Sequence, residues 1–542
     1  MSTAGEPIDP PVLSGGLCYA LLFSTLGVIL LTTVAIGGRR LLDTDNDNYM
    51  TARNTQSGVW LTLSYFASSI GAWVIFAVPE AAILGGSIAL AGYTISAVVP
   101  LVLFEFMTPY LRARLPTGIT FAEFVQERYG TENTVVFSLF SFFYMFIYLV
   151  AEFTSVGLVC TSLSNIRTLD DTFWSTDYSA GPQPLAPALA TSMITLAYTG
   201  LGGLPVSLLT DRLQGVGVFV LSIIIAIAAF AYPTGFSDDR WEQVTSTGTD
   251  DDYAKAVYIA VSLILGVTSA NMFHAGYWQR IWSAENDRQV RIAIIGSSVL
   301  VIIVMSLFGI IGFFAYAIYG TNLFSYGGFY VVFLAAPILV RSNVPEVWHG
   351  LFIVLGVAMV ASTADSIQSG MMAVLSPATE ALFGAKLGDK GKMAVNFGVM
   401  AAFNVLAIVI SLSGQSVLML FLLADLLCAA AIVPLFMGFW RRTHPYAALA
   451  GCFTGVGTIV VVYAIFNSTS DEGFNTLTGF GGIFYKSATA AFCLAPTMSG
   501  LVTLVISLLT NHHFEGFQLK DSTTEQKKTE TISDVEMKNA AL

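Results

Sequence analysis

The sequence predicts an all-α polytopic membrane protein, and its composition and apolar segments are the reasons. Of the 542 residues, 55% are hydrophobic and only 11% are charged. A soluble protein of this length needs far more charge to cover its surface. Apolar runs of about 20 residues, the length of a helix that crosses a bilayer, recur along the chain. The net charge of −12, with no basic stripe, argues against nucleic-acid binding.

These runs predict about thirteen transmembrane helices. In chain order they cover residues 14–38, 58–80, 84–106, 134–164, 186–204, 208–233, 256–278, 291–319, 347–376, 393–413, 416–440, 445–466 and 484–510.

The basic residues predict the orientation, because cytoplasmic loops of membrane proteins are rich in Lys and Arg. With the N-terminus outside, 19 of the 24 Lys and Arg, Arg280 among them, fall on the cytoplasmic side and 5 on the other. The acid-rich loops around Asp170 and Asp250 then lie outside, as does the glycosylation sequon at Asn467, whose use the sequence leaves open.

The predicted second span is weakened in its middle. Residues 64–80 contain three serines, then Gly71, and Pro79 before Glu80. A break here would free carbonyl oxygens to bind a cation, whereas ordinary helix packing through small residues is the alternative. The seventh span is also weakened, between Gly266 and Gly276. There Ser269, Asn271 and His274 could line a cavity, although a packing role is favoured for His274.

The ninth span places two hydroxyls and an acid in an apolar stretch. Lipid cannot hydrogen-bond Ser362, Thr363 or Asp365, so these side chains must face the protein interior or a watery cavity. Hydroxyl and carbonyl oxygens are ligands that a small hard cation prefers. This pattern indicates an ion-coupled carrier.

Four motifs carry a resemblance to a known family. They are Ala67-Ser-Ser-Ile-Gly-Ala-Trp73, Tyr198-Thr-Gly-Leu-Gly-Gly203 with Thr210-Asp-Arg-Leu-Gln214, Tyr277-Trp-Gln-Arg280, and Ala361-Ser-Thr-Ala-Asp-Ser366. In this order and spacing they resemble the sodium:solute symporter family, which includes proline, sugar, iodide and pantothenate carriers and the fungal urea/polyamine permeases. The resemblance covers residues 14–510.

The resemblance implies an inverted repeat of five plus five broken-helix spans. The expected first part is residues 1–57, which hold an extracellular segment, the first helix and a cytoplasmic loop. The transport core follows at residues 58–466. An extracellular loop and the last helix cover residues 467–510, and a disordered cytoplasmic tail covers residues 511–542. It also implies one sodium ion as the coupling ion and no other cofactor. Its implied ligands are the carbonyl oxygens of Ala67, Ile70 and Met359 and the hydroxyls of Ser362 and Thr363.

Two acids match or adjoin family positions linked to the ion. Asp211 corresponds to an acid near the cytoplasmic sodium exit, although capping of the sixth span is an equal interpretation. Asp365 follows the sodium hydroxyls, and we expect a structural or indirect electrostatic role. Ser69 stands where proline carriers have an aspartate, which argues against an unmodified proline-carrier mechanism.

The substrate is expected to be a small nitrogenous solute. Asp425 lies in the eleventh span, which lines the substrate cavity in the family, and an acid there suits a polyamine, unless it only bonds another helix. Ser69, Trp73 and Asn271 would also suit urea. Glu80 and Glu105 fall near span ends, and Glu152 is ambiguous. Proline transport, proton coupling through Asp365 or Glu152, and a nutrient sensor remain alternatives; no nucleotide loop, metal cluster or nucleophile–base set indicates an enzyme. The expected location is the plasma membrane, and the oligomeric state stays open.

Overall fold

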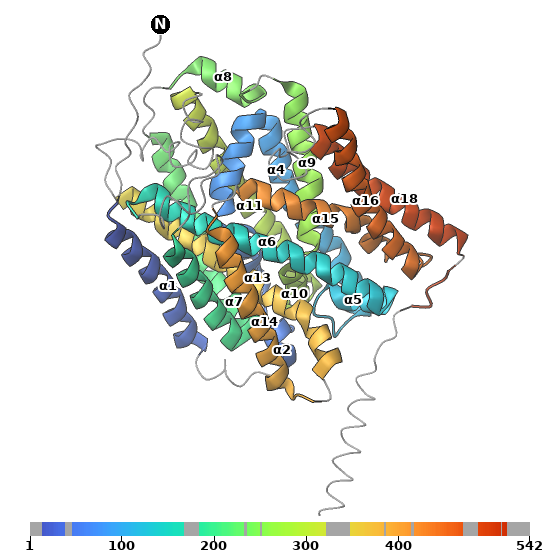
Figure 1. The fold of residues 1–542 in the computed structure, drawn as a ribbon. Coiled ribbons are helices and arrows are strands. Elements are labelled where there is room, and N and C mark those ends of the chain that lie inside the picture. Colours follow the sequence, from blue (N-terminus) through green and yellow to red (C-terminus); the bar gives the residue numbers. More distant parts are fainter. Residues whose placement is uncertain are drawn as a thin grey trace, which may run out of the picture.

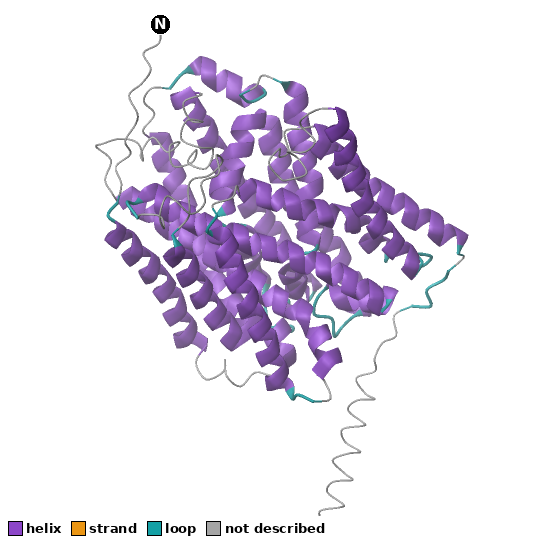
Figure 2. Ribbon diagram, viewed as in Figure 1, coloured by secondary structure: helices purple, strands orange, loops and turns teal. Residues whose placement is uncertain are grey.

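The computed structural model describes residues 13–37, 46–166, 184–231, 236–249, 252–320, 347–383, 386–413, 417–469, 486–510 and 512–516. In this part of the chain the regular structure is helical, apart from two isolated β-bridges (Figure 2). The all-α prediction is confirmed.

The described part of the chain contains the following helices. They are α1 (Gly15–Gly37), α2 (Asn46–Thr51), α3 (Gly58–Ser69), α4 (Trp73–Arg114), α5 (Phe121–Tyr129), α6 (Thr131–Leu163), α7 (Leu185–Ala231), α8 (Asp238–Ser246), α9 (Tyr253–Met272), α10 (Ala275–Ser283), α11 (Asp287–Tyr319), α13 (Val347–Phe383), α14 (Asp389–Ser411), α15 (Val417–Met437), α16 (Pro445–Thr469) and α18 (Lys486–Leu509).

Within the described ranges, eleven helices are long and apolar enough to cross a membrane. The chain is therefore a multi-pass membrane protein, but the predicted number of thirteen spans is not confirmed. The difference arises because α4 and α7 each contain an internal kink and each cover parts of two predicted spans. Three short helices, α2, α5 and α8, were not predicted. For α5 the sequence carried a signal, because Thr120 and Glu123 form a capping box at its start.

Two glycines make the kinks of α4 and α7. Gly86 (φ 64°) and Gly203 (φ 60°) adopt a conformation that disfavours any residue with a Cβ. A Cβ on Gly203 would overlap the carbonyl oxygen of Tyr49. The Tyr49 hydroxyl donates to the carbonyl of Gly200 (3.0 Å), so α2 is held against the kink. The kink therefore depends on close approach between two backbones.

We expect Gly203→Ala to reduce the yield of folded protein sharply. The positive φ alone costs about 1–2 kcal/mol for alanine, and the overlap with Tyr49 adds to it. Gly217→Ala in the same helix is the control, because a Cβ there meets nothing within 4 Å. Fluorescence-detected size-exclusion chromatography of both variants measures the difference. Equal monodisperse peaks would contradict the prediction.

Two of the predicted spans are interrupted, at the weak points that the sequence indicated. The first break lies between α3 and α4 at residues 70–72, where Ile70 leaves the helical conformation (φ −109°, ψ 79°). The second lies between α9 and α10, at Phe273 and His274. Trp278 holds the second break in place by donating its indole N–H to the carbonyl of Met272 (2.8 Å). Each break opens one of the two predicted repeats.

The remaining helices surround these breaks. In Figure 1, α16 and α18 lie together on one side of the molecule and α1 lies on the opposite side. Among the described spanning helices, α13 is the most enclosed by its neighbours. Of the predicted tail, residues 512–516 lie back on the body, with the amide of Phe514 donating to the carbonyl of Arg441 (2.9 Å). The rest of the tail and the loop at Asp170 lie outside the described residues.

Candidate functional site

The end of α3 and the middle of α13 bring predicted sodium ligands together. The Ser362 hydroxyl lies 3.0 Å from the carbonyl oxygen of Ala67 and 2.9 Å from that of Met359, and it can donate to either. Ile70 follows α3 at the break. All these residues are buried. Three of the five predicted ligands thus meet at one hydroxyl, across the interface between the two helices.

Thr363 supplies a further oxygen in this region. Its hydroxyl is buried and has no hydrogen-bond partner among the described residues. An unpaired hydroxyl in a membrane protein core is costly, because neither lipid nor a side chain compensates it. An uncharged set of carbonyl and hydroxyl oxygens, in which one hydroxyl has no partner among the described residues, suits a hard monovalent cation such as sodium. The donor set therefore fits the ion.

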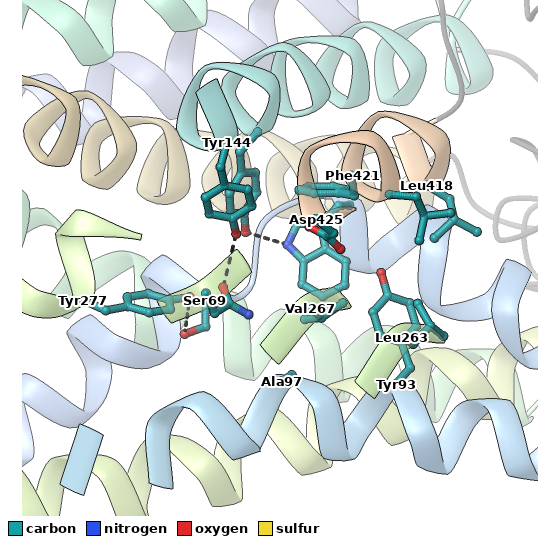
Figure 3. Close-up of a pocket in the computed structure, with 14 residues that line it drawn as sticks. Ser69, Tyr93, Ala97, Tyr144, Leu263, Val267, Tyr277, Leu418, Phe421 and Asp425 are labelled. Carbon is teal, nitrogen blue, oxygen red and sulfur yellow. Dashed lines mark hydrogen bonds between the residues drawn. The ribbon is translucent and has the colours of Figure 1, made fainter. Parts of the chain in front are cut away.

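A pocket lies where the two breaks approach α6 and α15 (Figure 3). Its lining comes from the end of α3 and from α4, α6, α9, α10 and α15. The four residues predicted to contact substrate, Ser69, Trp73, Asn271 and Asp425, all lie in this lining. Asn271 accepts a hydrogen bond from Tyr144 (3.3 Å). The pocket therefore joins residues that are far apart in the sequence.

Neither Ser269 nor His274 is part of this lining. The Ser269 hydroxyl donates to the carbonyl of Leu265 in its own helix (2.6 Å). His274 is fully buried and stacks on Tyr277 at 4.3 Å between ring centroids. This position fits a packing role, but the hydrogen bond expected for a packing histidine is absent: neither ring nitrogen has a partner among the described residues.

Six of the fourteen residues that line the pocket are aromatic, and the sequence predicted only Trp73 among them. They are Trp73, Tyr93, Tyr144, Tyr148, Tyr277 and Phe421. The Trp73 indole donates to the Tyr148 hydroxyl (2.9 Å) and packs edge-on against Phe421. With 39 Phe and 21 Tyr in the chain, no sequence signal separates these rings from the others. Figure 3 shows the oxygens of Asp425 and Tyr93 turned toward one another across the pocket.

Asp211 forms a buried ion pair with Arg280, at 2.8 Å and with both side chains fully buried. Ser64 donates to the same carboxylate oxygen (2.5 Å) and accepts from Arg280 (2.8 Å), and Arg280 also donates to Ser366 (2.8 Å). Two expectations are corrected here. Asp211 lies inside α7 and does not cap a helix, and Arg280 lies in the core rather than in a cytoplasmic loop. This network ties α3, α7, α10 and α13 together.

We expect Arg280→Gln to destabilise the protein by about 3–5 kcal/mol, because it leaves the Asp211 carboxylate buried without its counter-charge. The double variant Arg280→Gln/Asp211→Asn should recover much of this loss. Thermal unfolding in detergent measures both. The control is Arg291→Gln, whose ion pair with Glu105 (2.7 Å) is partly exposed and should contribute about 1 kcal/mol or less. A single variant as stable as the control would contradict the prediction.

Asp365 lies on the α7 side of α13, in a cluster of hydroxyls that Ser366 joins to the Asp211–Arg280 network. Its carboxylate accepts hydrogen bonds from Tyr198 (2.9 Å), Ser207 (2.8 Å), Thr210 (3.0 Å) and Ser366 (3.2 Å). Ser362, one turn earlier, faces Ala67 of α3 instead. On its α3 side, α13 presents the oxygen cluster around Ser362. On its α7 side it presents Asp365, whose hydrogen bonds to Tyr198, Ser207 and Thr210 hold α13 and α7 together.

In the described part of the chain, no group of three or more His, Cys, Asp or Glu side chains is placed to hold a metal ion. The oxygen cluster between α3 and α13 is therefore of a different type from a transition-metal site, which would use imidazole or thiolate ligands.

Comparison with known proteins agrees with this geometry. The sodium:solute symporter family matches residues 49–455, which is most of the chain. The spermidine transporter DUR31 of Candida albicans (strain SC5314 / ATCC MYA-2876) is 25% identical over 480 residues, covering 86% of this chain and 84% of that protein. The osmoregulated proline transporter OpuE of Bacillus subtilis (strain 168) is 24% identical over 481 residues, covering 84% and 91%.

A solved structure shares the fold. It is a substrate-bound outward-open state of a Na⁺-coupled sialic acid symporter, with a TM-score of 0.69 and 18% identity over 92% of this chain and 98% of that one. The family match, the interrupted helices and this shared fold identify a solute symporter rather than an enzyme. The chain belongs to the sodium:solute symporter family.

Proposed function

We propose that this protein is a sodium-coupled symporter that imports a small organic cation of the polyamine type across the plasma membrane. The observation that carries the substrate class is Asp425, a carboxylate only 2% exposed in a pocket with aromatic walls. None of the described residues that line the pocket is Lys, Arg or His. An ionised carboxylate at this depth is stabilised by a cation, and the faces of aromatic rings attract one as well. A protonated amine satisfies both.

One of the two relatives supports an amine as the substrate. DUR31 is a spermidine transporter, and the identity of 25% extends over most of both chains. The proline transporter OpuE matches at a similar level, so relatedness alone does not select the substrate. Ser69 and Asn271 could bind urea, but a neutral solute would leave the charge of Asp425 uncompensated. The charge of the pocket therefore favours the amine.

Sodium is proposed to bind between α3 and α13, to the carbonyl oxygens of Ala67, Ile70 and Met359 and the hydroxyls of Ser362 and Thr363. The unpaired Thr363 hydroxyl supports this assignment. Inward movement of one charge contributes about 2.3 kcal/mol per 100 mV of membrane potential. The N-terminus is proposed to be extracellular and the C-terminus cytoplasmic, as the distribution of Lys and Arg predicts.

The broken helix provides the coupling. The carbonyls of Ala67 and Ile70 and the pocket residues Ser69 and Trp73 lie within one short segment around the break. Ion binding would fix this segment against α13, and the fixed segment completes one wall of the substrate pocket. Loss of the ion on the cytoplasmic side would free this segment from α13 and loosen the wall of the substrate pocket. Asp211, held by Arg280 and Ser64, would then act on the ion's exit path electrostatically.

Uptake of labelled spermidine, urea and proline, with and without external sodium, tests the proposal in cells that lack their own carriers. We expect sodium-dependent uptake of spermidine. Sodium-dependent uptake of urea or proline alone would overturn the substrate class. Uptake that follows pH but not sodium would overturn the ion. A protein at the cell surface that carries none of the three, yet signals their presence, would indicate a nutrient sensor.

A further inference from the structure

Glu152 is a buried acid that the sodium site and the pocket lining leave unexplained. It lies in α6 and is fully buried. One carboxylate oxygen accepts a hydrogen bond from the backbone N–H of Ala72 (3.1 Å), at the start of α4. The other oxygen is buried and has no hydrogen-bond partner among the described residues. The helix terminus thus compensates only part of the charge.

The unpaired oxygen faces the α3–α4 break. A Cβ built on Gly71 would overlap this oxygen and would also lie 2.8 Å from the indole of Trp73. Glycine at position 71 therefore allows Glu152 to approach both the break and Trp73. Any larger residue at position 71 would push the carboxylate away.

The same arrangement places Glu152 directly behind the substrate pocket. Tyr148 precedes Glu152 by one helical turn on α6, so both lie on one face of that helix. Tyr148 and Trp73 line the pocket and are joined by a hydrogen bond of 2.9 Å. Asp425 lies in the same pocket lining as this aromatic pair, whereas Glu152 is not part of the lining. The Trp73–Tyr148 pair therefore links the two acids, because it shares the pocket with Asp425 and Tyr148 shares a helix face with Glu152.

We propose that Glu152 is a second anionic anchor for substrate, so that the preferred substrate is a linear diamine or polyamine with one ammonium group at Asp425 and another at Glu152. This inference rests on the proposed function, because it assumes that Asp425 binds an amine. The methylene chain between the ammonium groups would pass along Trp73 and Tyr148, whose rings suit an apolar chain. Separation of the Trp73–Tyr148 pair would open the way, and an ammonium group would supply the partner that the free oxygen of Glu152 lacks.

The alternative is that Glu152 only caps the start of α4. The variant Glu152→Gln separates the two roles, because glutamine keeps an oxygen that can accept from Ala72 and loses only the charge. Inhibition constants are measured on the purified full-length protein in sodium, by competition against labelled spermidine. The competitors are α,ω-diamines of increasing length and n-alkyl monoamines of matched length. Glu105→Gln, at the partly exposed ion pair with Arg291, is the control for the chemical change.

We expect wild-type protein to bind long diamines at least about tenfold more tightly than matched monoamines. Glu152→Gln should remove this preference, with monoamine constants changed less than about twofold. Asp425→Asn should weaken both classes. Glu105→Gln should behave as wild type.

Three results would overturn the inference. Equal weakening of monoamines and diamines by Glu152→Gln would assign the residue a structural role. Unchanged diamine binding in that variant would show that it is no anchor. If Glu152→Gln does not fold, the wild-type series decides, and equal affinity for diamines and monoamines rejects the anchor while the proposed function stands. Absence of any amine binding by wild type, or intact amine binding in Asp425→Asn, would reject the proposed function itself.

Discussion

Replacement of Thr363 by alanine is expected to raise the sodium concentration for half-maximal uptake by about 10- to 100-fold. The proposed site would lose one of five oxygen ligands, and contacts of this kind with a charged group contribute about 1.5–3 kcal/mol. The stability of the fold should change little. The hydroxyl has no partner among the described residues, so its removal leaves no other group without a hydrogen bond. The measurement is sodium-activated uptake, normalised to protein at the cell surface.

Thr363→Ser is the matched control. It keeps the hydroxyl and removes only a methyl group, so sodium activation should stay within a few-fold of wild type. A Thr363→Ala protein that reaches the surface and shows unchanged sodium activation would remove this residue from the ion site. Loss of the folded protein in both variants would instead indicate that the side chain serves packing.

Asp425→Asn is expected to reduce the apparent affinity for spermidine by at least about 30-fold. Loss of one partner of a buried charge pair costs about 2–5 kcal/mol, and asparagine keeps the size of the side chain. Binding of the substrate to purified protein, with uptake measured in parallel, separates an affinity defect from a transport defect. Any urea transport should persist, since a neutral amide does not require the carboxylate.

The control for this change is again Glu105→Gln, which removes a carboxylate of the ion pair with Arg291. Spermidine binding should be unaffected by it. Spermidine affinity that is the same in Asp425→Asn and Glu105→Gln would exclude Asp425 as the substrate anchor, and would favour its alternative role as a helix–helix hydrogen-bonding residue.

The breaks illustrate what could be predicted locally. Gly71 with its neighbouring serines, and the segment between Gly266 and Gly276, indicated weak points in two spans, and both spans are interrupted in the structure. The prediction succeeded because glycine and small polar residues weaken a helix by local physical effects. The number of spans did not follow as simply, since Gly86 and Gly203 join neighbouring helical segments through kinks.

The partners of individual side chains, unlike the breaks, could not be predicted from the local sequence. Arg280 was counted with the cytoplasmic loops because it lies two residues beyond the predicted span 256–278, yet it lies in the core against Asp211. Apart from Trp73, the aromatic residues of the pocket could not be predicted from the sequence, and neither could the position of Glu152 at the α3–α4 break. Each depends on contacts between residues of different helices, such as the bond from Ala72 to Glu152.

The sequence by itself determined the class of protein, the approximate spans, the two interruptions and the small polar groups that must find partners. It could do so because lipid requires every spanning segment to be apolar and to satisfy its own backbone hydrogen bonds. Each segment can therefore be recognised from its own residues. Only the tertiary structure decided which side chains face the pocket, the ion-ligand cluster or the lipid. Residues that face lipid and residues that face other helices are both apolar, so periodicity does not separate them, and the assignment requires the packing of the helices against one another.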